Sequence, residues 1–226
     1  IFFFDQGSKK DKRWSLHDQK SLEGYEFLFK QLINNDWMGL IIKPKKPGIL
    51  ENKLSKISEL YEQAMKTNRC IMIGDTSAKH IKNFEMIPAS ISLASDFAIH
   101  DTMVAGTAGL ESALTNTPCF FLDIYNYSDS IFYSNSEIKI VYNNLNDLWS
   151  SMISYLNTKK TFTDLYWYKI LDKLDPYRDN KSNLRIEQYL SHLSSGFNKN
   201  YNSNEVLEFA AEKFAKDWGD DKIIKY

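Results

Sequence analysis

The sequence predicts an α/β fold in which one parallel sheet is covered by helices on both faces. Short apolar runs alternate with helical patterns through the first two thirds of the 226-residue chain. The runs show no polar alternation, which is typical of parallel strands buried on both faces. Each run ends in a polar or glycine-containing turn, as expected where a strand leaves a sheet.

The elements follow one another in a regular order. The first run, Ile-Phe-Phe-Phe, is followed by Asp5-Gln6-Gly7-Ser8, and the run 70–73 by Gly74-Asp75-Thr76. The predicted strands are 1–4, 40–42, 70–73, 97–99, 119–122 and 138–141. The predicted helices are 19–34, 51–66, 89–94, 107–114 and 145–156. With right-handed crossovers this order predicts a doubly wound, Rossmann-like parallel sheet of about six strands.

A helical tail follows the predicted sheet domain, so we place a domain boundary between 1–158 and 159–226. The tail contains amphipathic patterns at 183–193 and 204–218. Asn204 is a candidate N-cap and Gly219 a candidate stop. The chain also opens on an apolar strand without methionine, so we expect a fragment that lacks an N-terminal lobe. Trp167, Tyr177 and Trp218 would then provide apolar surface for that lobe.

Composition excludes several classes of protein. A net charge of −1 argues against a nucleic-acid partner, and no apolar run approaches the ~18 residues of a transmembrane segment. Cys70 and Cys119 lie inside apolar runs, which predicts core residues and neither a disulfide nor a metal site. No signal peptide, P-loop, GxGxxG, GxSxG or HExxH motif is present.

In a doubly wound sheet, ligands bind where strands end, so the residues at those positions are candidates. The strand ends predict one rim formed by Asp5, Gln6, Lys43, Asp75, His100 and Asp123. His100 could contact phosphate or act as an acid or base, although a histidine beside Asp101 is more often structural. Lys43 could neutralise a phosphate or simply belong to a solvated turn.

The segment after His100 is the strongest candidate for phosphate binding. Gly106 and Gly109 flank the start of the predicted helix 107–114 and could let backbone approach a ligand. The N–H groups of such an N-terminus attract phosphate, and Glu111 shares a helical face with Thr107. Arg178 in the tail could pair with a phosphate or with a neighbouring aspartate.

Taken in order, these segments resemble the C-terminal half of a GT-B glycosyltransferase of the bacterial capsular or surface polysaccharide type. The resemblance is carried by LIIKPKKPG, by FEMIPASISLASDFAIHDTMVAGTAGLESALTNTPCFFLD and by DPYRDNKSNLRIEQYL with VLEFAAEKFAKDWG. Lys45 stands where many relatives have histidine, so that role is not carried over.

The resemblance implies a nucleotide-sugar substrate, a glycan or lipid-linked glycan acceptor, and no metal or cofactor. It assigns Glu111 to ribose, Lys43 to leaving-group charge, and the Gly106, Thr107 and Ala108 segment to phosphate. Met86 and Ile87 would border the base. From their own positions in the sequence, Asp75 and Arg178 are further donor-site candidates and His100 is the catalytic candidate. It implies a cytoplasmic location and leaves peripheral attachment to the inner membrane open.

Three alternatives remain open at this stage. A CDP-glycerol-type polyol-phosphate transferase shares the fold. A UDP-sugar 2-epimerase-like enzyme is disfavoured, because its acidic and histidine residues lack clear counterparts here. A Rossmann-like module that serves assembly without catalysis would bind no nucleotide.

Overall fold

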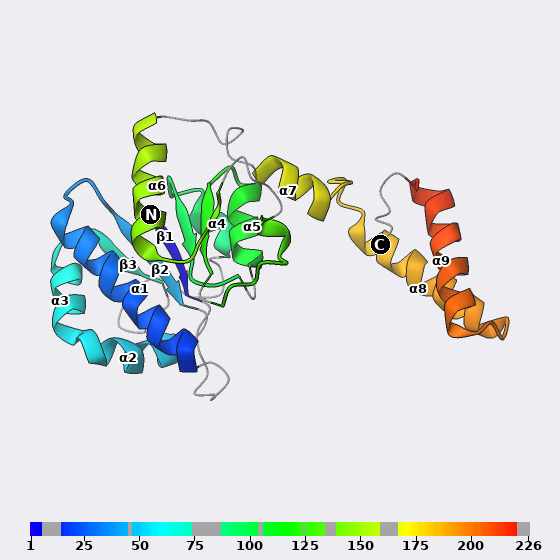
Figure 1. Ribbon diagram of the computed structural model, residues 1–226, viewed down its shortest axis with the longest axis horizontal. Coiled ribbons are helices and arrows are strands. Elements are labelled where there is room, and N and C mark those ends of the chain that lie inside the picture. The colour runs from blue at the N-terminus through cyan, green and yellow to red at the C-terminus, as the bar shows by residue number, and fades with distance from the viewer. Residues whose placement is uncertain are drawn as a thin grey trace. The chain divides into compact units, whose positions relative to one another are not determined.

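The computed structural model describes residues 1–5, 15–44, 47–73, 87–103, 106–123, 125–133, 139–158 and 167–220. Contacts divide the chain into two compact units, Ile1–Ile170 and Leu171–Tyr226. The first unit contains an all-parallel six-stranded sheet in the order β3-β2-β1-β4-β5-β6 (Figure 1). The predicted Rossmann-like α/β fold is therefore confirmed.

The strands are β1 (Phe2–Asp5), β2 (Leu40–Pro44), β3 (Cys70–Met72), β4 (Ala98–His100), β5 (Cys119–Leu122) and β6 (Val141–Tyr142). β1 lies between β2 and β4, and its three phenylalanines are at most 4% exposed. A central strand is covered on both faces, which explains why it is apolar at every position before Asp5. β6 begins at Val141 and is shorter than the predicted run 138–141, of which Ile138 lies outside the described residues.

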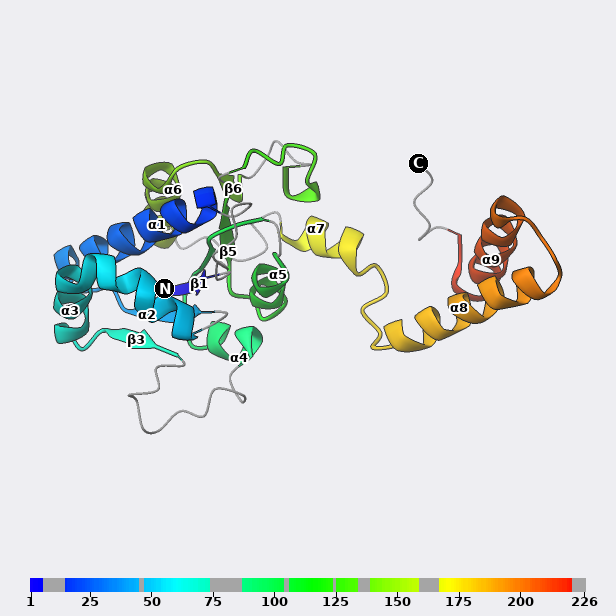
Figure 2. The ribbon, with the colours of Figure 1, turned by 90° about the horizontal axis from the view of Figure 1, so that it is seen from below.

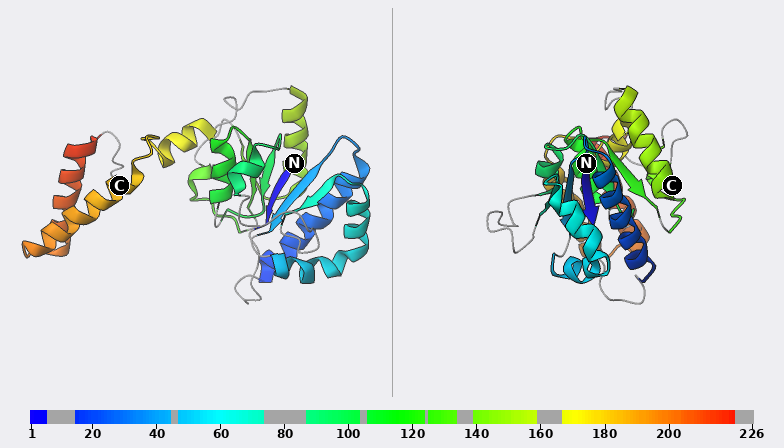
Figure 3. Two further views of the ribbon diagram at one scale, coloured as in Figure 1. Left: turned by 180° about the vertical axis from the view of Figure 1, so that it is seen from behind. Right: turned by 90° about the vertical axis from the view of Figure 1, so that its left-hand side faces the viewer.

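The helices of the first unit are α1 (Ser15–Asn34), α2 (Pro47–Leu54), η2 (Ser55–Ile57), α3 (Ser58–Lys66), α4 (Pro88–Ser92), α5 (Thr107–Leu114), η3 (Ile131–Tyr133) and α6 (Leu145–Thr158). Figure 2 and the right-hand view of Figure 3 show α1 and α6 on one face of the sheet and α4 and α5 on the other. On the first face, Phe3 packs edge-on against Tyr25 of α1, with ring centroids 5.2 Å apart. On the second face, α4 packs beside α5.

The helix predicted at 51–66 is broken in the structure into α2, η2 and α3. Ile57 has φ −129° and ψ 33°, outside the helical region, so the backbone changes direction there. Leu54 is buried before the break and Ala64 after it. Buried residues therefore lie on both sides of the break.

The boundary between the two units falls within α7 (Trp167–Leu174), later than the predicted boundary at 158/159. The sequence pattern did not predict α7. Trp167 and Ile170 are both fully buried, and this burial extends the first unit to Ile170. Trp167 therefore does not provide free surface for a missing lobe.

The second unit contains the helices α8 (Ser182–Asn198) and α9 (Ser203–Trp218), which pack against each other. The N-cap of α9 is Asn202 and not Asn204, because the Asn202 side chain accepts hydrogen bonds of 3.0 Å from the N–H groups of Asn204 and Glu205. Gly219 ends the helix with a φ of 89°, as predicted. Apolar side chains remain exposed in this unit, namely Leu174, Leu184, Ile186, Leu190, Phe197 and Leu207.

Candidate functional site

The candidate site lies at the carboxyl edge of the sheet, where β1 and β4 are neighbours. From β1 the chain continues through β2 to β3, and from β4 it continues through β5 to β6, so the strand order reverses between β1 and β4. Connections on the two sides leave this point on opposite faces of the sheet. In open α/β sheets the crevice at such a switch point is where ligands bind.

Four residues form a row across the sheet, each at the last position of its strand or one residue before it. Lys43 is in register with Phe4, Phe4 with His100, and His100 with Phe121. Side chains in register on parallel strands project to the same face, which here is the face covered by α5. The structure thus brings Lys43 and His100 to one edge and one face, as the predicted rim requires.

His100 lies between two aromatic rings. Its ring centroid is 5.8 Å from that of Phe4 and 5.6 Å from that of Phe121, and the residue is 1% exposed. Nδ1 accepts a 3.3 Å hydrogen bond from the backbone N–H of Thr102 and lies 3.9 Å from Asp101 Oδ1. An accepting Nδ1 belongs to the neutral tautomer that carries its proton on Nε2. These contacts describe a packed histidine, and its catalytic role stays a prediction.

Helix α5 is the element that follows β4 and begins at Thr107, so its first turn lies toward the carboxyl edge of the sheet. Thr107 is exposed and Ala108 is half-buried, so the first turn reaches the surface. Backbone N–H groups in a first turn have no partner inside the helix and can donate to an anion. This is the position that the predicted phosphate site requires.

The two glycines around this N-terminus have a packing role that the sequence did not reveal. A Cβ on Gly109 would lie 2.6 Å from Phe121 Cζ and 3.1 Å from Cys119 Sγ, and one on Gly106 would lie 2.9 Å from Phe121 Cε1. Both glycines therefore let α5 approach β5 closely. Whether they also let a ligand approach the backbone stays a prediction.

Glu111 lies one helical turn after Thr107 and is half-buried. Its carboxylate has no hydrogen-bond or ion-pair partner within the described ranges of the chain. An acidic group on the first turns of this helix can accept hydrogen bonds from sugar hydroxyls. Lys43 is also half-buried at the end of β2, and the described residues offer it no acidic partner.

The other predicted site residues are only partly covered by the described ranges. Asp75, Met86 and Gln6 lie outside them. Ile87 directly precedes α4 and is 55% exposed. Arg178 belongs to the second unit, where Nη2 lies 2.7 Å from Asp172 Oδ1.

Asp123, at the end of β5, organises the following turn. One carboxylate oxygen accepts a 3.1 Å hydrogen bond from the N–H of Tyr125, and the other accepts a 2.8 Å bond from the N–H of Tyr127. The Tyr133 hydroxyl donates to the same carboxylate. Burial and the Asp123 carboxylate raise the pKa of Tyr133 to about 12. Asp123 therefore lies on the rim as predicted, with a role in shaping the loop.

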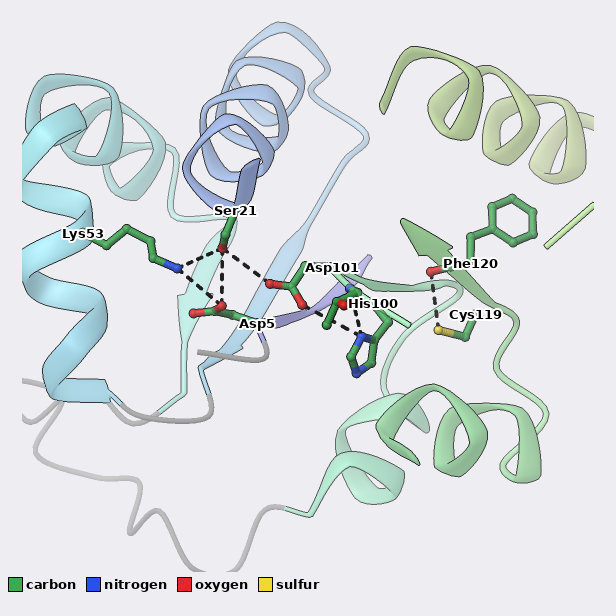
Figure 4. A network of polar contacts seen from close by, with 8 residues as sticks. Asp5, Ser21, Lys53, His100, Asp101, Cys119 and Phe120 are labelled. Atoms are coloured by element: carbon green, nitrogen blue, oxygen red, sulfur yellow. Dashed lines mark hydrogen bonds and ion pairs between the residues drawn. The ribbon is translucent and has the colours of Figure 1, made fainter. Parts of the chain in front are cut away.

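A buried polar network on the opposite face of the switch point was not predicted. Figure 4 shows Lys53 of α2, Ser21 of α1, Asp5 of β1 and Asp101 directly after β4 converging at this edge. Lys53 Nζ donates a 2.9 Å hydrogen bond to Ser21 Oγ and lies 3.6 Å from Asp5 Oδ1. Ser21 Oγ lies 3.4 Å from Asp5 Oδ1 and 3.4 Å from Asp101 Oδ2. All four residues are at most 8% exposed.

The network lies beside Tyr25, another buried polar side chain of α1. Burial, together with the Asp5 and Asp101 carboxylates, raises the pKa of Tyr25 well above its ordinary value. Lys53 Nζ is 5.8 Å from the centre of the Tyr25 ring, within reach of a cation–π contact. The network therefore combines carboxylates, a cation and a neutral phenol at the end of β1.

One signal in the sequence could have revealed this network. Lys53 lies on the same face of its helix as Leu50 and Leu54, and this face is buried. Ser21 lies on the same buried face of α1 as Tyr25 and Leu28. A charged or hydroxyl residue on the apolar stripe of a helix must find a polar partner inside the protein.

Comparisons with protein-family models, with curated proteins and with solved structures found no match to this chain. The fold and the strand-end geometry define it as an all-parallel, Rossmann-like α/β protein. Among the described side chains, no three acidic, histidine or cysteine residues come together as a metal site. Within the described ranges, none of the helices has the length and apolarity needed to cross a membrane.

Proposed function

We propose that this chain is the donor-binding lobe of a GT-B glycosyltransferase that transfers a sugar from a nucleotide-sugar to a bacterial surface glycan. One observation carries the proposal: α5 begins at the carboxyl edge beside the β1/β4 switch point, with Lys43 and Glu111 both half-buried. The family resemblance of the sequence motifs supplies the reaction class, and the fold is compatible with it.

In the proposed reaction the bond between the anomeric carbon of the sugar and the diphosphate oxygen breaks. A new bond forms from that carbon to an acceptor hydroxyl, whose proton passes to a base. The nucleoside diphosphate leaves with additional negative charge on its terminal oxygen. Preorganised donors and cations at that position lower the barrier by stabilising this charge.

The roles of the residues follow from their chemistry. The N–H groups of Thr107 and Ala108 would donate to the diphosphate, and Lys43 would offset its charge. Glu111 would accept hydrogen bonds from the ribose hydroxyls. No base is assigned, because the acceptor lobe in this class of enzyme precedes the donor lobe and often provides it.

The first experiment measures thermal unfolding of the chain with CMP, CDP, UMP, UDP and GDP side by side. A nucleotide at 100 times its Kd should stabilise the protein by about 2.7 kcal/mol. A preference for one base would identify the nucleotide of the donor. Selective stabilisation by CMP and CDP would favour the alternative of a CDP-glycerol-type polyol-phosphate transferase. If none of the five shifts the transition, the proposal fails and the non-catalytic module is favoured.

The second experiment tests the ribose contact by titration calorimetry with the nucleotide found in the first. Glu111→Gln should weaken binding by about 1.5–3 kcal/mol, as for a lost hydrogen bond to a charged group. Glu62→Gln, at an exposed position of α3, is the matched control and should leave binding unchanged. Unchanged affinity in folded Glu111→Gln protein would exclude the assignment of Glu111.

A further inference from the structure

We infer that Lys53 is a positioning and charge-setting residue, whose buried ammonium group makes the switch point more favourable for the phosphates of a nucleotide than for the nucleoside alone. The inference rests on the proposed function and adds a residue that the family motifs do not include. Lys53 would act from beneath the crevice through Asp5 and Asp101, without touching the ligand.

The first step is the position of the network. Asp5 ends β1, and Asp101 directly follows His100 at the end of β4. These are the two strands between which the strand order reverses. Any ligand in the crevice would lie above both carboxylates, so their charge contributes to the potential that the ligand meets.

The second step is charge. Asp5 and Asp101 are 4% and 2% exposed, and Lys53 is 8% exposed. Burial weakens screening by water and salt, so each charge acts over a longer distance than on the surface. Two carboxylates at this position oppose an incoming phosphate, and Lys53 adds one positive charge among them.

The third step is the free-energy cost of burying the Lys53 ammonium group. Removing an ammonium group from water is unfavourable by several kcal/mol, and a buried ion pair often contributes little net stability. Lys53 hydrogen bonds to Ser21 and lies next to Asp5, so it joins α2 to α1 and to the end of β1, and Ser21 extends the network to Asp101. Stability alone gives little reason for a charged group here, whereas the electrostatic role uses the charge itself.

The groups that face Lys53 within the described ranges are known. Asp5 of β1 and Ser21 and Tyr25 of α1 contact it, and Asp101 is joined to it through Ser21. A substitution that removes the ammonium makes this region one unit more negative. That change does not depend on what other partners the two aspartates have.

The experiment compares affinities for uridine, UMP and UDP, and in parallel for cytidine, CMP and CDP, by calorimetry at low ionic strength. A unit charge acting over roughly 10 Å at an effective dielectric constant of about 20 changes a binding constant roughly tenfold. Lys53→Met should therefore weaken binding of the nucleoside diphosphate about tenfold or more and weaken binding of the monophosphate less. It should weaken binding of the nucleoside by about twofold at most. Raising the salt concentration should reduce the difference only partly, because the network is buried.

Three variants separate charge from structure. Lys56→Met removes the same charge at an exposed position of η2 and should leave all affinities unchanged. Asp5→Asn should act in the opposite direction and strengthen binding of the diphosphate relative to binding of the nucleoside. The double variant Lys53→Met/Asp5→Asn should recover the wild-type ratio of diphosphate affinity to nucleoside affinity. Asp5→Asn keeps the inference testable if Lys53→Met alone does not fold.

The outcomes distinguish the two proposals. If wild-type protein binds neither these ligands nor GDP, the proposed function fails and this inference fails with it. If wild-type protein binds UDP or CDP but Lys53→Met weakens binding of the nucleoside and of the diphosphate equally, only the role of Lys53 is overturned. An unchanged ratio in Asp5→Asn would overturn it in the same way.

Discussion

The indole N–H of Trp167 donates a 2.9 Å hydrogen bond to the backbone carbonyl of Cys119. Trp167 is fully buried, and its ring centroid lies 5.6 Å from that of Phe121 and 5.8 Å from that of Phe132. This contact joins the start of α7 to β5, on the face of the sheet where α5 packs. It explains why the first unit continues beyond the sheet and α6.

Trp167→Phe should destabilise the protein by about 1–3 kcal/mol, because the buried Cys119 carbonyl loses its donor while most of the aromatic contact remains. Trp167→Ala should cost about 3–5 kcal/mol by opening a cavity as well. Denaturant unfolding measures both values. Trp37→Phe is the control, since Trp37 is 57% exposed and its replacement should change stability by less than about 0.5 kcal/mol. Equal stabilities for the Trp167 variants and wild type would contradict the assigned contact.

Gly109→Ala and Gly24→Ala should have opposite effects on stability. The new Cβ at position 109 meets Phe121 and Cys119 at 2.6 and 3.1 Å, which overpacks the α5–β5 contact at a cost of about 1–3 kcal/mol. At position 24, within α1, the nearest atom is Phe3 Cζ at 3.7 Å, so the higher helix propensity of alanine should stabilise by about 0.5–1 kcal/mol.

The same unfolding assay tests the cause of the Gly109 effect. Phe121→Leu in the Gly109→Ala background should recover part of the loss, because it removes the ring atom that the methyl group meets. Strictly additive effects of the two substitutions would show that this clash is not the source of the destabilisation.

The two cysteine thiols should be unreactive in the folded protein. Burial raises the pKa of Cys70 to about 12 and raises that of Cys119 further still. Thiolate is the reactive form, so iodoacetamide at pH 8 should label neither residue until denaturant is added. Rapid labelling of Cys119 under native conditions would contradict its placement beneath α5.

Asp179 should remain ionised well into the acid range. Hydrogen bonds of 2.9 and 2.7 Å from Arg185 hold the pKa of its carboxyl at about 2, below the ordinary 3.8. Because the folded pKa is depressed, this pair stabilises the second unit fully above pH 3.8 and loses its effect as the pH falls toward 2. A carbon-detected NMR titration measures the value directly.

The matched variant for that titration is Arg185→Lys, which keeps the charge but loses the bidentate geometry. It should raise the pKa of Asp179 toward 3.8. It should also weaken the cation–π contacts of Arg185 with Tyr177 and Trp218, whose ring centres lie 3.8 and 4.9 Å from the guanidinium carbon. An Asp179 pKa near 3.8 in the wild-type protein would show that the ion pair does not persist in solution.

Particular elements show how far the sequence alone could predict the site. Helix 107–114 was predicted with the bounds that α5 has, because its apolar spacing and the preceding glycine are local signals. The rim of Asp5, Lys43, His100 and Asp123 followed from a general property of parallel sheets, that their strands end at one edge. The helix 51–66 was wrong as a single element, because the backbone leaves the helical region at Ile57.

The sequence by itself determined the class of fold, the positions of the strands and the burial of Cys70 and Cys119. These depend on periodicity and on the chemistry of neighbouring residues, which the chain carries locally. Only the tertiary structure decided the strand order, the role of Gly109 against Phe121, and the network of Asp5, Ser21, Lys53 and Asp101. The partners in that network come from α1, α2 and two strand ends, and Ser21 and Asp101 are 80 residues apart. Such pairings depend on how helices and strands pack, and no local pattern specifies which buried polar groups will meet.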